Sequence, residues 1–209
     1  IRGQYPSVDF IKAINKEVKK RKIILICDEI TTGFRANASG CFLKVGLKPD
    51  VVVYGKGIGN GFAISAVVGK KKIMNMAQES FISSSNWSER VGFVAALATI
   101  KTIKKQRTWM HISKIGKYVK EKWLKIFKKY ELNIEVSDFE PLLTMKPNYG
   151  KINDYLLTYI IQEMLKKGYL TSSSIYFSYA HKKKIIDKYL VDFESVIKKL
   201  KLILSKKQI

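Results

Sequence analysis

Residues 22–35 read KIILICDEITTGFR, an unbroken apolar run that ends in two carboxylates, Asp28 and Glu29. Residues 48–61 read KPDVVVYGKGIGNG, a second apolar run that ends at Lys56 among glycines. Continuous apolar runs of this kind are typical of strands buried on both faces of a parallel sheet. The separation of 28 residues (56 − 28) between Asp28 and Lys56 suffices for one connection back to the same edge of a sheet. We therefore expect these two side chains to lie in one crevice, beyond the carboxyl ends of the strands.

A carboxylate and a lysine side by side match the chemistry of pyridoxal 5′-phosphate (PLP). This cofactor needs a lysine to hold its aldehyde as a Schiff base and an acid beside its pyridine nitrogen. The carboxylate keeps that nitrogen protonated, because an opposite charge nearby favours the charged form. Each half alone has an ordinary alternative, since Asp28 and Glu29 could begin a helix and the glycines around Lys56 could form a solvated loop. The two halves together, in this order, favour the PLP interpretation.

These motifs resemble the signature of class III PLP-dependent aminotransferases, and within that class they are most similar to the glutamate-1-semialdehyde 2,1-aminomutase-like branch. The resemblance extends over nearly the whole chain, from RGQYP at residues 2–6 to GYLT at 168–171 and SYAH at 178–181. It implies PLP as the cofactor. It also implies an α/β fold, the C-terminal part of the PLP-dependent transferase fold type I with a mixed sheet and flanking helices, followed by an α+β C-terminal domain.

The resemblance assigns roles to four residues. Lys56 matches the Schiff-base lysine, and Asp28 matches the partner of the pyridine nitrogen. Ile30 matches the aliphatic residue that packs on one face of the ring. Ser85 falls where the family has a threonine that reaches the PLP phosphate, often from the neighbouring subunit, and Ser84 is the alternative one residue away.

The function that the resemblance implies is PLP-dependent transamination, or intramolecular amino transfer, on a small amino or oxo substrate. The substrate amine displaces Lys56, which then takes the Cα proton. A homodimer with the active site at its interface is the expected assembly. Ser-Glu-Arg at residues 88–90 replaces the Gly-Asn-Pro that the family often has, which indicates a sub-branch and leaves the substrate open. A truncated or non-catalytic fragment that acts as an interaction module remains an alternative.

Length and charge bound the interpretation further. The chain has 209 residues, whereas members of this family are about twice as long, so we expect a fragment whose phosphate loop and ring-stacking aromatic lie upstream. The net charge of +22 would also suit a basic nucleic-acid-binding domain. Only five of the cations are arginines, the residue type suited to bidentate phosphate contacts, and the lysines are dispersed over every expected helix. The composition therefore argues against nucleic acid as a partner, and a membrane is not an expected one.

Cysteines and histidines indicate neither a disulfide framework nor a metal site. Cys27 and Cys41 are too few for either a disulfide framework or a zinc cluster. His111 and His181 lack the spacing of a metal pair. Apolar runs are too short to cross a bilayer, and the sparse cysteines suit a reducing cytoplasm.

Hydrophobic periodicity indicates that a second region starts near residue 108. The resemblance implies that residues 1–107 are the C-terminal half of the large PLP-binding domain and that residues 108–209 are a small α+β C-terminal domain. Helices are expected over 8–20, 73–76, 89–105, 109–130, 154–167 and 182–204. The helix at 89–105 is expected to have glycine and alanine on one face, at Gly92, Ala95, Ala96 and Ala98. The helix at 109–130 is expected to have an apolar stripe of Ile112, Ile115, Val119, Trp123, Ile126 and Phe127. Strands are expected over 23–27, 51–54, 63–68, 134–136, 142–145 and 175–178, and residues 81–88 are expected to form a loop.

Overall fold

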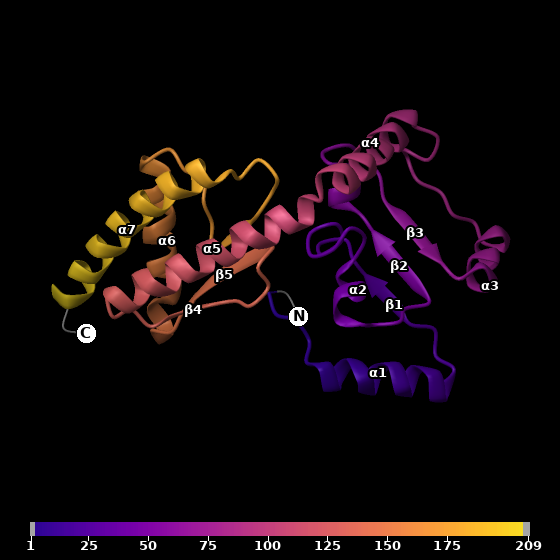
Figure 1. Cartoon of the computed structure of the whole chain (residues 1–209), viewed down its shortest axis with the longest axis horizontal. Coiled ribbons are helices and arrows are strands. Elements are labelled where there is room, and N and C mark those ends of the chain that lie inside the picture. Colours follow the sequence, from indigo (N-terminus) through magenta and orange to yellow (C-terminus); the bar gives the residue numbers. More distant parts are fainter. Residues whose placement is uncertain (1–2, 207–209) are drawn as a thin grey trace. The chain divides into compact units, whose positions relative to one another are not determined.

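The computed structural model describes residues 3–206, which divide into two compact units (Figure 1). The N-terminal unit comprises Tyr5–Met110, and the C-terminal unit comprises residues 3–4 and 111–206. Arg2, in the first stretch of family resemblance, lies outside the described residues.

A three-stranded mixed sheet forms the centre of the N-terminal unit. Its strands are β1 (Ile26–Asp28), β2 (Val51–Tyr54) and β3 (Ala66–Gly69), in the order β1-β2-β3. β1 runs parallel to β2, with Asp28 opposite Val53, whereas β3 runs antiparallel to β2. The helices are α1 (Val8–Arg21), α2 (Cys41–Val45), α3 (Lys71–Met74) and α4 (Arg90–Gln106), with 3-10 turns η1 (Lys56–Ile58) and η2 (Asn75–Glu79). The expected α/β class with a mixed sheet and flanking helices is confirmed.

β1 departs from the sequence prediction in both length and burial. The strand is shorter than the expected 23–27, and the side chains of Ile23, Ile24 and Ile26 are 51%, 55% and 61% exposed. The expectation of a strand buried on both faces is therefore wrong for the described chain. The physical reason is that strand side chains point to the two faces of the sheet, and the described residues leave those faces largely uncovered at β1.

Small residues let α4 pack closely in the N-terminal unit. Gly92 and Ala96 are buried, and α4 packs against η1, the turn that contains Lys56. A Cβ atom added at Gly92 would lie 2.7 Å from the carbonyl oxygen of Ala63, closer than real Cβ contacts come. The predicted glycine–alanine face thus serves close packing, and it supports the turn that carries the lysine.

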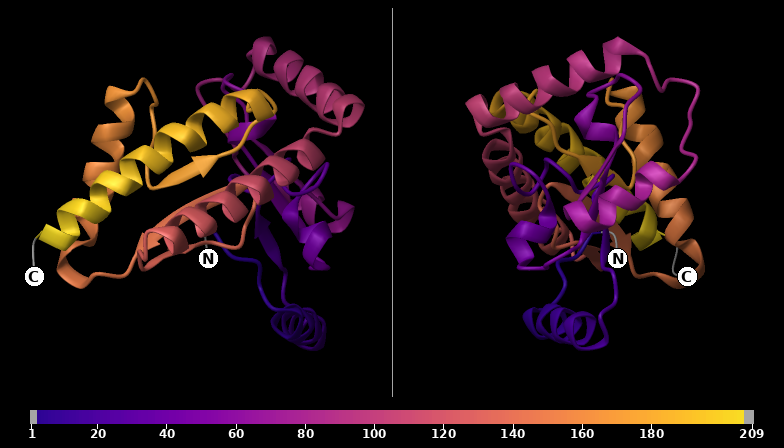
Figure 2. Two further views of the ribbon diagram at one scale, coloured as in Figure 1. Left: turned by 60° about the vertical axis from the view of Figure 1, so that its left-hand side comes forward. Right: turned by 90° about the vertical axis from the view of Figure 1, so that its right-hand side faces the viewer.

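A separate core holds the C-terminal unit together. Helices α5 (Thr108–Lys129), α6 (Asn153–Lys166) and α7 (Lys183–Lys206) pack with an antiparallel sheet of β4 (Ile134–Val136), β5 (Leu142–Pro147) and β6 (Ser174–Tyr176), and η3 (Gly150–Ile152) precedes α6. Figure 2 shows α7 running beside β6. The apolar stripe predicted for α5 is buried throughout: Ile112, Ile115, Val119, Trp123, Ile126 and Phe127. Its Trp123 ring stacks on Phe193 of α7 with centroids 5.4 Å apart.

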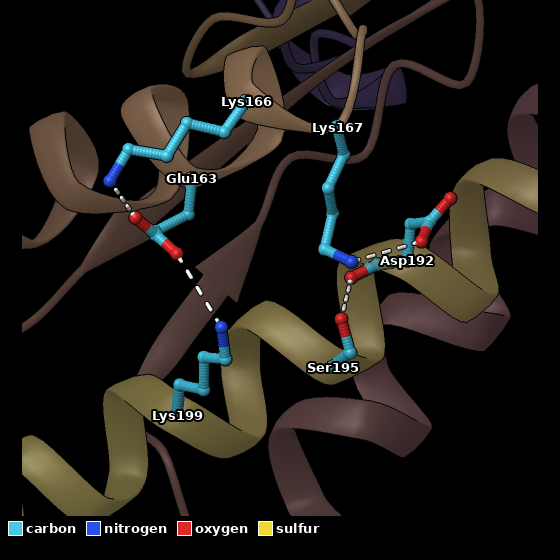
Figure 3. Close-up of polar contacts among 6 residues, drawn as sticks. All are labelled: Glu163, Lys166, Lys167, Asp192, Ser195 and Lys199. Atoms are coloured by element: carbon cyan, nitrogen blue, oxygen red, sulfur yellow. Dashed lines mark hydrogen bonds and ion pairs between the residues drawn. The ribbon is translucent and has the colours of Figure 1, made fainter.

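Polar contacts at the surface add to the packing of α6 and α7 (Figure 3). The Glu163 carboxylate pairs with Lys166 in its own helix, and its second oxygen lies 3.8 Å from the Lys199 ammonium nitrogen. Lys167 Nζ lies 3.1 Å from Asp192 Oδ1. Exposed ion pairs of this kind contribute about 0–1 kcal/mol each, so the apolar core supplies most of the stability of this unit.

Residues 3–206 contain neither a membrane-spanning helix nor a metal-binding cluster. No helix there is both long and apolar enough to span a bilayer. No group of three or more His, Cys, Asp or Glu side chains there is arranged to hold a metal ion.

Candidate active site

The parallel pair of β1 and β2 brings Asp28 and Lys56 to the same edge of the sheet. Asp28 is the last residue of β1, and Lys56 follows the last residue of β2 by two positions. The Glu29 N–H donates to the Val53 carbonyl at 2.9 Å, which extends the pairing one residue beyond β1. Since the carboxyl ends of parallel neighbours share an edge, this is the edge where ligands bind in open α/β sheets.

Lys56 stands in an unusual backbone conformation. Its φ of 44° is in the left-handed region, which costs a side-chain-bearing residue about 1–2 kcal/mol. The side chain is exposed, and its Nζ donates to Thr31 Oγ1 at 2.9 Å. Backbone strain of this kind is common at functional sites, but five other non-glycine residues among those described also have a positive φ, so the conformation does not by itself identify the anchor.

Asp28 and Ile30 occupy the turn that follows β1. Asp28 is exposed, and its Oδ1 accepts the backbone N–H of Ile30 at 2.9 Å. Ile30 is half-buried against Gly55, since a Cβ added at Gly55 would lie 3.2 Å from Ile30 Cγ2. The edge thus presents a carboxylate, an apolar side chain and an amine close together in the fold.

Ser85 is not brought into this group of residues. It lies in the loop between η2 and α4, where residues 81–88 form no regular helix or strand, and its side chain is exposed. Within the part of the chain that the structure describes, its hydroxyl has no hydrogen-bond partner. Ser84 lies in the same loop and is also exposed.

Two residues of the site were missed by the sequence reasoning. Thr31 Oγ1 accepts a hydrogen bond from the Lys56 ammonium. Glu29 is buried, with only 1% of its surface exposed. The available signal was a pair of hydroxyl residues directly after two carboxylates, a composition typical of turns closed by side-chain hydrogen bonds. Spacing and apolar periodicity carry no information about such contacts.

The Cys27 thiol and the Tyr54 hydroxyl lie in the interior beside this edge, near the Glu29 carboxylate. Burial, and after it the charge of the Glu29 carboxylate, raise the pKa of Cys27 to about 12. Burial also raises the pKa of Tyr54, against the opposing effect of its hydrogen bond with the Ser39 hydroxyl. Because nucleophilicity requires the thiolate, Cys27 is a packing residue and not a reactive one.

The part of the chain that contains this edge matches a known protein family. Residues 3–143 match the family Aminotransferase class-III. The match covers well over half of the chain and includes both strands and the turn that contains Lys56. The chain belongs to the class-III aminotransferases.

The similar curated proteins include an aminomutase and a transaminase. The chain is 30% identical over 215 residues to glutamate-1-semialdehyde 2,1-aminomutase of Nitrosopumilus maritimus, and the match covers 94% of this chain and 50% of the relative. It is 29% identical over 136 residues to 2′-deamino-2′-hydroxyneamine transaminase of Streptomyces kanamyceticus, covering 65% of this chain and 35% of the relative. The chain spans about half the length, or less, of these relatives.

Solved structures share the fold. The FumI protein of Sphingopyxis sp. MTA144, in its PLP internal aldimine form, matches with a TM-score of 0.85 at 19% identity, over 93% of this chain and 47% of FumI. An omega-transaminase from Sphaerobacter thermophilus matches with a TM-score of 0.82 at 17% identity, over 94% of this chain and 49% of the neighbour. The chain therefore has the fold of about half of a transaminase subunit.

Proposed function

We propose that the protein carrying this chain is a PLP-dependent aminotransferase or aminomutase that moves an amino group on a small amino or oxo substrate. The observation that carries the proposal is the placement of Lys56 and Asp28 at one carboxyl edge of β1 and β2 in a class-III chain. A lysine and an acid at one edge are the two groups that PLP requires of the protein. Relatives named as transaminases and as aminomutases support both reaction types.

The residues at this edge fit PLP. Lys56 Nζ is exposed and already held by a hydroxyl, the Asp28 carboxylate is exposed, and Ile30 offers an apolar surface. Gly61 has open space around its backbone, since nothing lies within 4 Å of a Cβ built there. When bound, PLP supplies an electron sink for the carbanion at the substrate Cα.

In this proposal each residue has a distinct task. Lys56 would hold the aldehyde of the cofactor, and its amine would move the proton at the substrate Cα. Asp28 favours the protonated pyridine nitrogen through its charge. Ile30 packs on one face of the ring, and Ser85, or Ser84, donates its hydroxyl to the phosphate.

The domain assignment belongs to the same proposal. Residues 1–107 are the C-terminal half of the large PLP-binding domain, and residues 108–209 are the small C-terminal domain. Support comes from the division of the chain into compact units near residue 110.

A second copy of the subunit is proposed to complete the active site. Large apolar side chains are exposed on and before α4, near Ser85 in sequence: Phe81 is 97% exposed, Trp87 61%, Val94 66% and Leu97 59%. Exposed apolar groups in such number are typical of protein interfaces.

A cytoplasmic location is proposed as well, supported by the two free thiols.

Amino transfer by the full-length protein tests the proposal. The purified protein is supplied with PLP, a panel of amino donors and oxo acceptors, and the amino products are quantified. Lys56→Ala is expected to reduce transfer to background, whereas the matched control Lys48→Ala, which changes another exposed lysine of the same unit, is expected to retain it. Wild-type transfer rates in Lys56→Ala would refute the assignment.

A further inference from the structure

Glu29 is the most buried of the charged side chains described in the chain, with 1% of its surface exposed. A buried carboxylate is costly unless hydrogen bonds replace its lost water. Its neighbour Asp28 points out to solvent, so the two adjacent carboxylates at the end of β1 have opposite environments.

Three donors surround the Glu29 carboxylate. The backbone N–H of Phe42, in the first turn of α2, donates to Oε1 at 2.7 Å. The Thr32 hydroxyl donates to Oε2, and the Cys27 thiol lies 3.8 Å from Oε1 as a weak donor. A carboxylate is an acceptor only, so it can serve all three donors at once, which an amide cannot.

The backbone of the following turn is closed around this carboxylate. The Gly33 N–H donates to the Glu29 carbonyl at 2.8 Å, and a Cβ at Gly33 would come within 2.6 Å of that oxygen. A Cβ at Gly40 would lie 2.9 Å from Glu29 Cδ. The segment from β1 to α2 therefore fits only with small residues at these two positions and with the carboxylate at its centre.

The same turn carries the hydroxyl that holds the cofactor lysine. Thr31, whose Oγ1 accepts from Lys56 Nζ at 2.9 Å, stands directly before Thr32, whose hydroxyl binds Glu29. Arg35 Nε donates to the Thr31 carbonyl at 2.9 Å and ties the turn from its other side. Fixing Thr32 thus fixes the position of Thr31 and, through it, the amine of Lys56.

We propose that Glu29 is a positioning residue that holds the amine of Lys56 in place through Thr32 and Thr31. The inference rests on the proposed function for its purpose, since a fixed lysine matters for attaching a cofactor and moving a proton. Its physical content, control of the Lys56 amine by a buried carboxylate, is measurable without PLP.

Competitive labelling of lysines in the PLP-free full-length protein tests the inference. Acetic anhydride is applied over pH 7–10, and the acetylated fraction of each lysine is read by peptide mass spectrometry. Glu29→Gln is expected to speed acetylation of Lys56 by roughly fivefold, about 1 kcal/mol, because the Thr32 hydroxyl loses its charged acceptor and is left with a weaker hydrogen bond to a neutral amide. Lys48 is expected to keep its wild-type rate, as an internal control. Glu79→Gln, which changes an exposed carboxylate of the same unit, is the matched control and is expected to leave Lys56 unchanged.

Thr32→Val provides a second, milder perturbation should Glu29→Gln fail to fold. It removes the hydroxyl that Glu29 holds and leaves the carboxylate its other donors, so the Lys56 profile is expected to shift in the same direction. The double variant is expected to change the rate by less than the product of the two single effects, because both act through one contact. A wild-type Lys56 profile in folded Glu29→Gln, or in Thr32→Val, overturns the inference, whereas failure of the proposed function appears separately, as absent amino transfer in the wild type.

Discussion

Replacing Gly116 by alanine is expected to have two opposing effects on the stability of the C-terminal unit, a gain in helix propensity and a loss in packing. Gly116 lies inside α5, where alanine is favoured over glycine by about 1 kcal/mol. A Cβ built on Gly116 would lie 1.9 Å from the carbonyl oxygen of Glu140 and 2.6 Å from its carbonyl carbon. These are backbone atoms, so the conflict cannot be relieved by a change of side-chain rotamer.

The packing cost is expected to exceed the propensity gain. Overpacking costs about 1–3 kcal/mol, occasionally more, and a contact this short with backbone belongs at the upper end. The net loss is then about 1–2 kcal/mol, which lowers Tm by roughly 2–8 °C for a domain of this size. Thermal unfolding of the full-length protein, followed by circular dichroism, measures it.

Ser113→Ala is the matched control, since it lies on the same helix one turn earlier and gains only propensity. Its Tm is expected to stay level or rise slightly. A Gly116→Ala protein as stable as the wild type, or more stable, would show that α5 does not approach the backbone of Glu140 as closely as described.

Three further predictions concern Cys27, Lys56 and Asp192. The rise in the pKa of Cys27 from 9.0 to about 12 lowers its thiolate fraction at pH 8 about a thousandfold. In a Cys41→Ser protein, Cys27 is therefore expected to react far more slowly with Ellman's reagent when the protein is native than when it is denatured. Equal rates would contradict the burial of the Cys27 thiol. Lys56→Gly is expected to be more stable than Lys56→Ala by about 1 kcal/mol, because glycine relieves the positive φ, and urea unfolding of both variants gives the difference. Hydrogen bonds from the Tyr169 hydroxyl and then from Lys167 lower the pKa of Asp192. The ionised Asp192 therefore stabilises the fold above pH 3.8, the ordinary pKa, and this contribution is lost as the pH falls through the lowered pKa. Asp192→Asn is expected to narrow the difference in Tm between pH 6 and pH 3, and an unchanged difference would argue against the Asp192 contacts.

The helices were the most predictable part of the fold. The stripe on α5 repeats at helical spacing over 22 residues, so many apolar positions agree on one face, and all six predicted positions are buried. Helix α2 spans only five residues between Gly40 and Gly46, too few for a period to emerge, and no helix was predicted there. Local pattern determines an element only when it repeats.

Strand burial and site detail depended on contacts that a local pattern does not carry. The run at 23–27 is apolar enough for a covered strand, yet Ile23, Ile24 and Ile26 are largely exposed, because the described residues leave the faces of the sheet uncovered there. The placement of Asp28 beside the carboxyl end of β2 could be predicted from the sequence, because it requires only that the two strands be parallel neighbours. The roles of Glu29 and Thr31 follow from how the turn folds back at Gly33 and Gly40, which depends on three-dimensional packing.

Covalent trapping of PLP identifies the anchoring lysine most directly. The full-length protein is incubated with PLP, reduced with borohydride, digested and sequenced by mass spectrometry. The proposed function predicts one dominant phosphopyridoxyl adduct, on the peptide that contains Lys56, and its loss in Lys56→Ala. An adduct spread over many of the exposed lysines, or one dominant on a different lysine, would contradict it.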